Sequence, residues 1–372
     1  MLRAILFLLI AGVLCAHHSI TAAYDDTRTV TVSGTVTKFD WANPHVWVFV
    51  DVNGTPQAVE FASRLELKRS GWSADSVKVG DQVTVTGNPA REAVQNGHGA
   101  VHGKTLVISE RGLLRTFNEA APEIVLTTNS GGKPTPRWPD GHPRFGPEPG
   151  AKSGYWTSPS VPSLYETSAG KIRMNSEGIL TNIGDANKVA PFQPWAKGLY
   201  LYRQRNFLKD DPMSSCLPPG GPRQFQAPYG VQFLEEPARQ RIFVLSRGGN
   251  RNWRLINLDG RPLPALDDLT PTYFGYSVAK WEGDTLVIQS VGYVERFWFS
   301  AGGLPHTESA RLTERISRPN FDTLKYEVTV DDPGAYTRPW TGGWTLQWIA
   351  ADESDEYFCD DYNRELEKGA TQ

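Results

Sequence analysis

A histidine and two glutamates near the C-terminal end of the chain have the spacing most suited to chemistry. His306, Glu308 and Glu314 occupy even positions of the segment 306–318, and so do the apolar residues of that segment. Alternate residues of a strand share one face, so this pattern predicts that the three ionisable side chains point inward. Tyr326, on the next predicted strand, is expected to face the same interior. We therefore predict a ligand-binding pocket lined by these four side chains.

Two interpretations of this polar cluster remain open. A histidine beside carboxylates with raised pKa values could serve as general acid and base, which would make the protein an enzyme. Alternatively, Glu314 forms a buried ion pair with Arg254 or Arg318, and ion pairing is the more common reason for a buried carboxylate. The sequence contains no phosphate-binding loop, dinucleotide-binding fingerprint, nucleophile elbow or zinc-protease histidine pair.

Histidines also occur together at the start of the chain. If a leader is removed after Ala16, His17 presents an α-amine beside its own imidazole, and these two nitrogens can chelate copper. If the cut falls one residue earlier, His18 becomes the third residue, where amine, amides and imidazole can surround Cu(II) in a plane. His45 or His98 could add a further ligand. We predict a copper site from His17, His18 and His45; the alternative is that the first two are solvated in a flexible arm.

Two cysteines remain once a leader is removed. Cys15 would leave with the leader, and Cys216 and Cys359 would stay in the mature chain. An even number of cysteines in an oxidising compartment indicates a disulfide, which we predict between these two residues. The alternative is two separate buried thiols. Two cysteines are too few for an all-thiolate zinc site.

The first 16 residues have the order of a secretory signal peptide. Arg3 is followed by an uncharged apolar run, 4–16, that is too short to span a bilayer, and polar residues follow it. We expect cleavage that leaves a mature chain starting at or within one residue of His17. The mature protein is then periplasmic or secreted. No later apolar run approaches the length of a membrane span, so the mature chain is expected to have none.

The rest of the sequence indicates a mainly β fold. Residues 29–109 alternate apolar and polar positions over five short segments, with one short helix after the third, which is the order of an OB-like five-stranded barrel. Prolines crowd the residues that follow. From about residue 229 to residue 349, antiparallel strands recur without long helices, which predicts a larger antiparallel β-barrel or a curved β-sheet. The predicted divisions are a signal peptide (1–16), an OB-like barrel (17–118), a Pro/Gly-rich linker or docking arm (119–190) and an antiparallel barrel domain (191–372).

Several motifs in the first part of the chain occur in a fixed order. They are Ala16-His17-His18-Ser19, Trp41-Ala42-Asn43-Pro44-His45-Val46-Trp47, Gly71-Trp72 and the strand that follows Gly80-Asp81. Through these motifs, residues from about 16 to 110 resemble an uncharacterised family of exported bacterial proteins, a domain of unknown function. Later segments such as Trp281-Glu282-Gly283-Asp284 resemble those of uncharacterised secreted bacterial proteins. The resemblance implies export and architecture, and it implies no activity.

Composition and charge narrow the classes of function. With 39% hydrophobic and 21% charged residues the chain is an ordinary globular protein, and its net charge of −3 disfavours nucleic acid as a partner. We therefore expect a soluble, extracytoplasmic, non-catalytic binding or interaction protein with a small-molecule or envelope ligand. The alternatives are an enzyme that uses His306, Glu308 and Glu314, and a copper-binding protein. The sequence leaves the identity of the ligand and the oligomeric state open.

Overall fold

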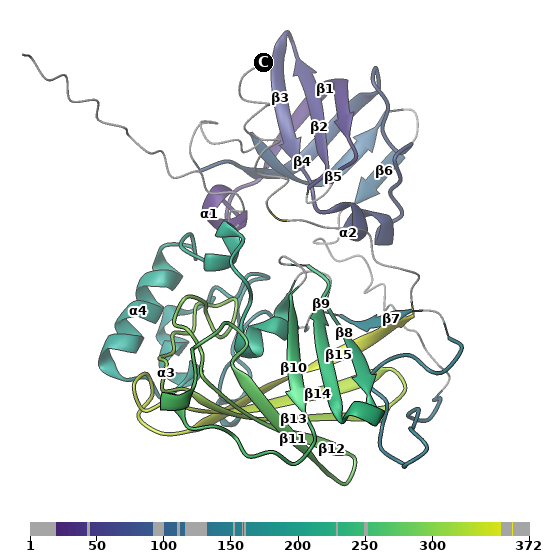
Figure 1. The fold of residues 1–372 in the computed structure, drawn as a ribbon. Coiled ribbons are helices and arrows are strands. Elements are labelled where there is room, and N and C mark those ends of the chain that lie inside the picture. Colours follow the sequence, from purple (N-terminus) through teal and green to yellow (C-terminus); the bar gives the residue numbers. More distant parts are fainter. Residues whose placement is uncertain are drawn as a thin grey trace, which may run out of the picture.

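The chain forms two closed β-barrels, and the helices of the described residues are short (Figure 1). The mainly β class predicted from the sequence is confirmed. The computed structural model describes residues 20–42, 45–91, 100–109, 112–115, 132–151, 153–157, 159, 161–227, 230–248, 252–350 and 359.

The first barrel has the five short strands, with a helix after the third, that the alternating pattern predicted. Its strand order is β3-β2-β1-β4-β5; a parallel pairing of β3 with β5 closes it, and β6 extends the sheet beyond β5. Val48 and Val50 are fully buried in the interior, and their neighbours Trp47 and Phe49 point to the other side because strand side chains alternate. The elements are α1 (Ile20–Ala23), β1 (Val30–Asp40), β2 (Trp47–Val52), β3 (Thr55–Glu60), α2 (Arg64–Arg69), β4 (Gln82–Pro89), β5 (Val101–Ile108) and β6 (Gly112–Arg115).

The second barrel is larger and closes through nine strands in the order β10-β11-β12-β13-β14-β15-β7-β8-β9. Its strands pair in an antiparallel manner, except that β10 and β11 run parallel. The tight hairpin between β11 and β12 turns at Gly283, which has a positive φ of 58° that suits glycine. The strands are β7 (Gly154–Trp156), β8 (Val231–Glu236), β9 (Arg241–Ser246), β10 (Trp253–Asn257), β11 (Tyr276–Glu282), β12 (Thr285–Val291), β13 (Arg311–Asn320), β14 (Thr323–Asp331) and β15 (Trp340–Ala350).

The described part of the proline-rich segment 119–190 is built into the second barrel. It supplies β7, and Phe145 and Trp156 from this segment are fully buried in the barrel core. Trp156 Nε1 donates to the carbonyl of Phe145 at 2.8 Å, and the buried Glu235 carboxylate accepts from the backbone N–H groups of Phe145 and Gly146. The described residues of this segment therefore pack into the core of the second barrel.

The helices are short. α4 (Pro194–Arg205) buries Ala196, Tyr200 and Gln204 against the second barrel. Within the described residues, no helix has the length and apolar character needed to cross a membrane. The helices of the second part are α3 (Ala186–Val189), α4 (Pro194–Arg205), η1 (Thr167–Ala169), η2 (Ile183–Asp185), η3 (Pro212–Ser215), η4 (Gly221–Gln226), η5 (Pro237–Arg239) and η6 (Leu266–Asp268).

Candidate functional site

A fully buried ion pair occupies the interior of the second barrel. Arg254 on β10 donates from Nη1 to Oε1 of Glu314 on β13 at 2.9 Å, and its Nη2 contacts the other carboxylate oxygen. Both side chains are at most 1% exposed. Arg254 also donates to the hydroxyls of Ser277 at 3.0 Å and Ser290 at 2.7 Å. The ion-pair interpretation of Glu314, with Arg254 as its partner, is therefore confirmed.

Tyr326 on β14 completes this cluster. Its hydroxyl donates to Oε1 of Glu314 at 2.8 Å, and its ring stacks on Trp344. Burial alone lowers the pKa of the Arg254 guanidinium, but the adjacent Glu314 carboxylate outweighs it, so that pKa is raised. Burial, with the Glu314 charge beside it, also raises the pKa of Tyr326 well above its usual value. At neutral pH Arg254 is therefore charged and Tyr326 protonated.

His306 has a different set of neighbours. Its imidazole stacks on the ring of Phe299 with a centroid distance of 4.0 Å, and Phe297 lies 4.4 Å away. Nε2 lies 3.1 Å from the carbonyl oxygen of Phe297, and Nδ1 lies 3.3 Å from that of Thr307. Burial lowers the pKa of His306 to about 4, so the ring is neutral at pH 7. Both ring nitrogens are directed at the backbone and not at the Glu314 carboxylate.

Glu308 is exposed, because β13 begins at Arg311 and not at residue 306. Thr307, just before it, is held by Asp332 through its backbone N–H at 2.7 Å and its hydroxyl at 2.6 Å. The Ala310 N–H then donates back to the carbonyl of Thr307 in a turn, which interrupts the strand alternation. Glu308 Oε atoms thus lie at the surface.

The four side chains predicted to line one pocket do not lie together in the structure. The structure brings Glu314 and Tyr326 together, whereas His306 lies in an aromatic layer and Glu308 lies at the surface. The strand alternation that predicted one common face applies only from Arg311 onward. Ligand binding by these residues stays a prediction.

A second polar cluster lies on the outer side of the first barrel. Val46 and Val59 point into the core, so the adjacent His45 and Glu60 face outward. Glu60 is nevertheless fully buried: one carboxylate oxygen contacts Nδ1 of His45, and the other accepts a hydrogen bond from the hydroxyl of Tyr24. Sequence reasoning missed Glu60 and Tyr24, because alternation alone predicts a solvated carboxylate at this position.

The chain segment that begins with α1 covers this carboxylate. Tyr24 directly follows α1, is 1% exposed and forms an isolated bridge with Ala90. His102 on β5 pairs in register with Glu60, and its ring centroid lies 5.3 Å from that of Tyr24. Imidazole nitrogens and carboxylate oxygens are common ligands of transition metals. The cluster therefore has ligand-type chemistry on a fixed scaffold.

The structure describes only one of the three predicted copper ligands, His45. His17 and His18 lie outside the described residues, and the side chain of His45 is 21% exposed beside Glu60. In the part of the chain that the structure describes, no group of three or more His, Cys, Asp or Glu side chains is suited to hold a metal ion. Copper binding by His17, His18 and His45 stays a prediction.

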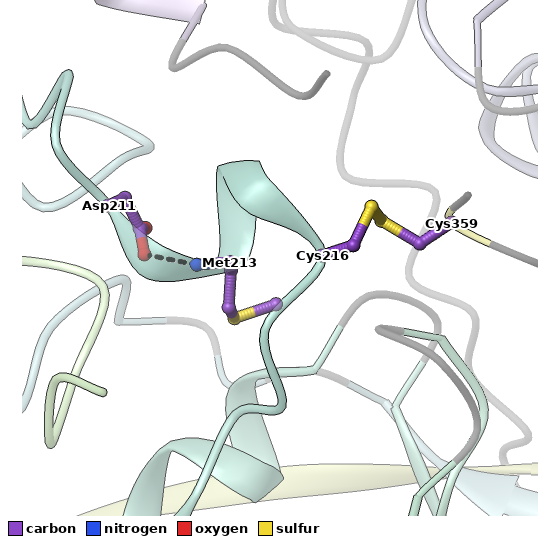
Figure 2. The surroundings of a disulfide bond; sticks show 4 residues. All are labelled: Asp211, Met213, Cys216 and Cys359. Carbon is purple, nitrogen blue, oxygen red and sulfur yellow. Dashed lines mark hydrogen bonds between the residues drawn. A yellow bond between two sulfur atoms is a disulfide. The ribbon is translucent and has the colours of Figure 1, made fainter. Parts of the chain in front are cut away.

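The predicted disulfide is confirmed. Cys216 and Cys359 are bonded, with their Cα atoms 5.6 Å apart (Figure 2). Cys216 directly follows η3, whose N-cap Asp211 accepts a hydrogen bond from the backbone N–H of Met213 at 3.0 Å. The bond joins positions 143 residues apart, so it ties residue 359 to a loop of the second barrel.

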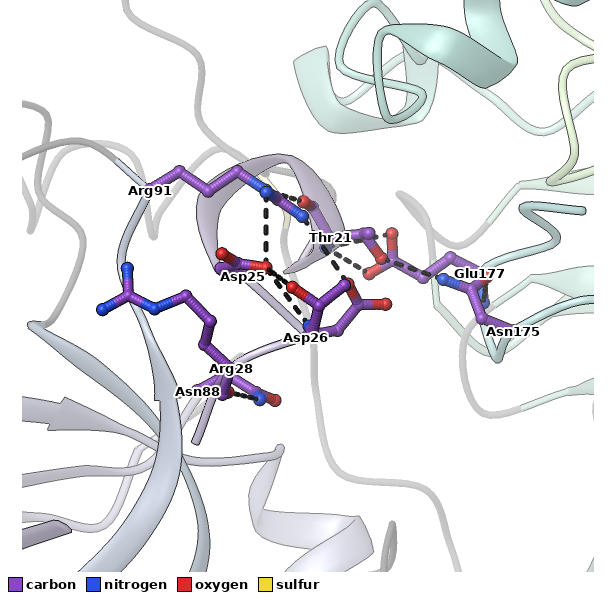
Figure 3. A network of polar contacts seen from close by, with 9 residues as sticks. Thr21, Asp25, Asp26, Arg28, Asn88, Arg91, Asn175 and Glu177 are labelled. Carbon is purple, nitrogen blue, oxygen red and sulfur yellow. Dashed lines mark hydrogen bonds and ion pairs between the residues drawn. The ribbon is translucent and has the colours of Figure 1, made fainter. Parts of the chain in front are cut away.

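Contacts around α1 connect the two barrels (Figure 3). The backbone N–H of Thr21 donates to both oxygens of the Glu177 carboxylate at 3.1 and 3.2 Å, and Asn175 donates to the Thr21 hydroxyl. On the first barrel, Arg91 Nε donates to the carbonyl of Thr21 at 2.8 Å. The Arg91 guanidinium also lies 4.1 Å from the centroid of the Phe207 ring, which follows α4. The segment that carries Tyr24 is thus fixed from both sides.

Comparison with known proteins finds a similarity for the first part of the chain. No curated protein matches the sequence. Residues 6–100 match the model of a family described as a family of unknown function (DUF6152). The match covers His45 and Glu60, and it agrees with the resemblance expected from the motifs around His17 and His45. Residues 6–100 of this protein are therefore similar to the DUF6152 family, a family of unknown function.

Proposed function

We propose that this protein is an exported, soluble, non-catalytic binding or interaction protein. The observation that carries the proposal is that the Arg254 guanidinium compensates the charge of the Glu314 carboxylate inside the barrel. Both of its oxygens are occupied by Arg254, and Tyr326 donates to one of them as well. A general acid or base must be able to exchange a proton with a substrate. A carboxylate enclosed in this way is better suited to fixing the barrel interior.

The enzyme alternative has less support. It requires His306, Glu308 and Glu314 within reach of one substrate, and these side chains lie in an aromatic layer, at the surface and in the ion pair respectively. His306 is also neutral at pH 7, with both ring nitrogens directed at backbone carbonyls. The arrangement therefore lacks an accessible pair of proton-transfer groups at these three positions.

Export is supported by the sequence of residues 1–16 and by the disulfide. The apolar run after Arg3 has the length and flanks of a signal peptide. Stable disulfides are typical of oxidising compartments such as the periplasm and the extracellular space. The Cys216–Cys359 bond is consistent with such a compartment.

The test is expression of the full chain with its own leader, followed by cell fractionation and N-terminal sequencing. We expect material outside the cytoplasm that starts at or within one residue of His17. Native mass spectrometry of this mature protein is expected to show a co-purified small molecule or envelope component that denaturation releases. Uncleaved protein confined to the cytoplasm would contradict export, and a consistently bare protein that also recruits no envelope component would contradict the binding function.

Copper binding is a second candidate function, favoured by one observation. His45, a predicted ligand, is held by direct contact with the buried Glu60 at the end of a strand. A metal ligand is commonly oriented by a partner of this kind, which fixes the imidazole before metal arrives. Titration of the metal-free mature protein with Cu(II) tests this function. Absence of binding above the level of a chain lacking His17 and His18 would exclude it.

A further inference from the structure

We propose that helix α4 docks on the headgroup region of an anionic lipid bilayer, through the aromatic side chains of its outward face and the basic residues beside them. The inference rests on the proposed function and deepens it, because it names the envelope component that an exported interaction protein would bind. α4 lies at the periphery of the second barrel (Figure 1). Its aromatic residues on the outward side are Trp195 and Tyr202.

The inward face of α4 holds the helix on the second barrel. Ala196, Tyr200 and Gln204 are buried at intervals of four residues, so they form one stripe along the helix. The Gln204 side-chain amide donates to the carbonyl of Gly178 at 3.0 Å and to that of Gly302 at 2.8 Å, which fixes the last turn. The position of α4 is therefore determined by contacts on this side.

The outward face carries two large aromatic side chains. Trp195 is 49% exposed and Tyr202 is 47% exposed, and they lie two helical turns apart on the same side of the helix. Leu199, between them, is half-buried. Nε1 of Trp195 donates to the carbonyl of Gly334 at 2.7 Å, so the polar group of the indole is satisfied and the exposed part of its ring is apolar. Polar residues normally occupy the solvent side of a surface helix, so this face is suited to a partner.

The charged residues of α4 and of the segments beside it are all basic. Residues 190–209 contain no aspartate or glutamate, although the whole chain has a formal net charge of −3. Arg203 is directed toward the protein, where it donates to a backbone carbonyl at 2.9 Å and packs over an aromatic ring. Lys197 is half-buried, and Arg205 and Lys209 are exposed. Positive charge is thus concentrated in the same segment as the exposed aromatic residues.

The combination of aromatic and basic residues selects the occupant. Trp and Tyr prefer the headgroup level of a bilayer, which accommodates both an apolar ring and a polar edge. Lys and Arg are attracted to anionic headgroups, and their alkyl chains lie along the apolar boundary. A second copy of the chain would bring the same basic segments together, which is unfavourable. Nucleic acid is disfavoured by the acidic net charge of the chain.

Co-sedimentation with lipid vesicles tests the inference. The anionic probe is vesicles of phosphatidylglycerol mixed with phosphatidylcholine, and the neutral probe is vesicles of phosphatidylcholine alone. We expect the affinity for the anionic vesicles to be higher by about tenfold or more. Raising the salt concentration from about 0.1 M to about 1 M shortens the Debye length from about 10 Å to about 3 Å, so it should remove most of this difference.

Two variants address α4 directly. Trp195→Ser removes the exposed ring and should weaken binding to the anionic vesicles by about tenfold. Lys197→Gln combined with Arg205→Gln removes two positive charges and should weaken it by about tenfold or more. Circular dichroism verifies folding, and Tyr202→Ser replaces Trp195→Ser if that variant does not fold. Every variant has the same N-terminus as the wild type, so a difference in affinity reports on the substituted residues.

The matched controls make the same changes elsewhere on the second barrel. Trp253→Ser removes a tryptophan on β10 that is 58% exposed. Arg311→Gln combined with Lys325→Gln removes two exposed basic residues of β13 and β14. Neither control should change the affinity for the anionic vesicles, because neither alters α4.

The outcomes separate this inference from the proposed function. If the wild type binds neither kind of vesicle, the inference fails, whereas export and ligand binding are decided by fractionation and native mass spectrometry. If the α4 variants bind the anionic vesicles as the wild type does, or if Trp253→Ser weakens binding as much as Trp195→Ser, the location on α4 is overturned. If the α4 variants lose a protein of the envelope and keep their affinity for vesicles, the partner is a protein and the lipid assignment is overturned.

Discussion

Replacing Glu314 by Gln should destabilise the second barrel strongly. The amide keeps the volume of the side chain but removes the negative charge that Arg254 contacts with two nitrogens. Because both side chains are at most 1% exposed, water cannot compensate the guanidinium. Breaking a buried pair in this way destabilises a protein by about 3–5 kcal/mol. For a domain of this size, each kcal/mol lowers the melting temperature by about 2–4 °C, so a fall of about 6–20 °C is expected.

The assay is thermal unfolding of the protein, monitored by near-ultraviolet circular dichroism and tryptophan fluorescence. Trp344 stacks on Tyr326 and reports on this barrel. The matched control is Glu282→Gln, which removes a glutamate from an exposed pair with Arg315 and should change the melting temperature little. A double variant, Arg254→Met with Glu314→Leu, should recover much of the lost stability, since no uncompensated charge remains.

Two results would refute this reasoning. A melting temperature for Glu314→Gln that equals that of the wild type would show that the pair contributes nothing net. A double variant as unstable as the single one would show that the loss arises from packing and not from the unpaired Arg254.

Three further predictions concern other parts of the molecule. Burial lowers the pKa of His306 from 6.5 to about 4, so the unfolded chain takes up this proton at higher pH than the folded protein does. The free energy of unfolding should therefore fall by about 3 kcal/mol between pH 7 and pH 4 relative to His306→Phe, measured by urea unfolding, and parallel pH profiles would contradict this. The Cys216–Cys359 bond closes a loop of 143 residues, so its reduction should destabilise the second barrel by about 5 kcal/mol in the chain-entropy model. Alkylation of the unfolded, unreduced protein should detect no free thiol. Two free thiols would show that the disulfide does not form. A fragment of residues 17–118 should fold alone, because the first barrel closes through its own β3–β5 pairing, and a poorly dispersed amide spectrum of that fragment would count against the boundary.

Local patterns predicted much of the fold. The alternation around Val48, Val50, Val83 and Val85 placed these residues in the first barrel core, and they are buried there. The strand pattern around Leu312 and Ile316 likewise predicted an inward-facing Glu314. Both succeed because a strand has a side-chain period of two residues, so each apolar residue fixes the direction of its neighbours. The same rule failed at Glu308, where the turn held by Thr307 and Asp332 ends the strand regularity.

By itself, the sequence predicted the mainly β class, the presence of a small and a larger barrel, and the pairing of Cys216 with Cys359. These follow from local periodicity and from residue counts. Only the tertiary structure decided which arginine neutralises Glu314, since Arg254 is 60 residues away and Arg318 was equally available in the sequence. It also decided that Glu60, outward on its strand, is buried beneath Tyr24 from 36 residues earlier. Burial of a polar side chain depends on which distant segment covers it, and no local pattern encodes that choice.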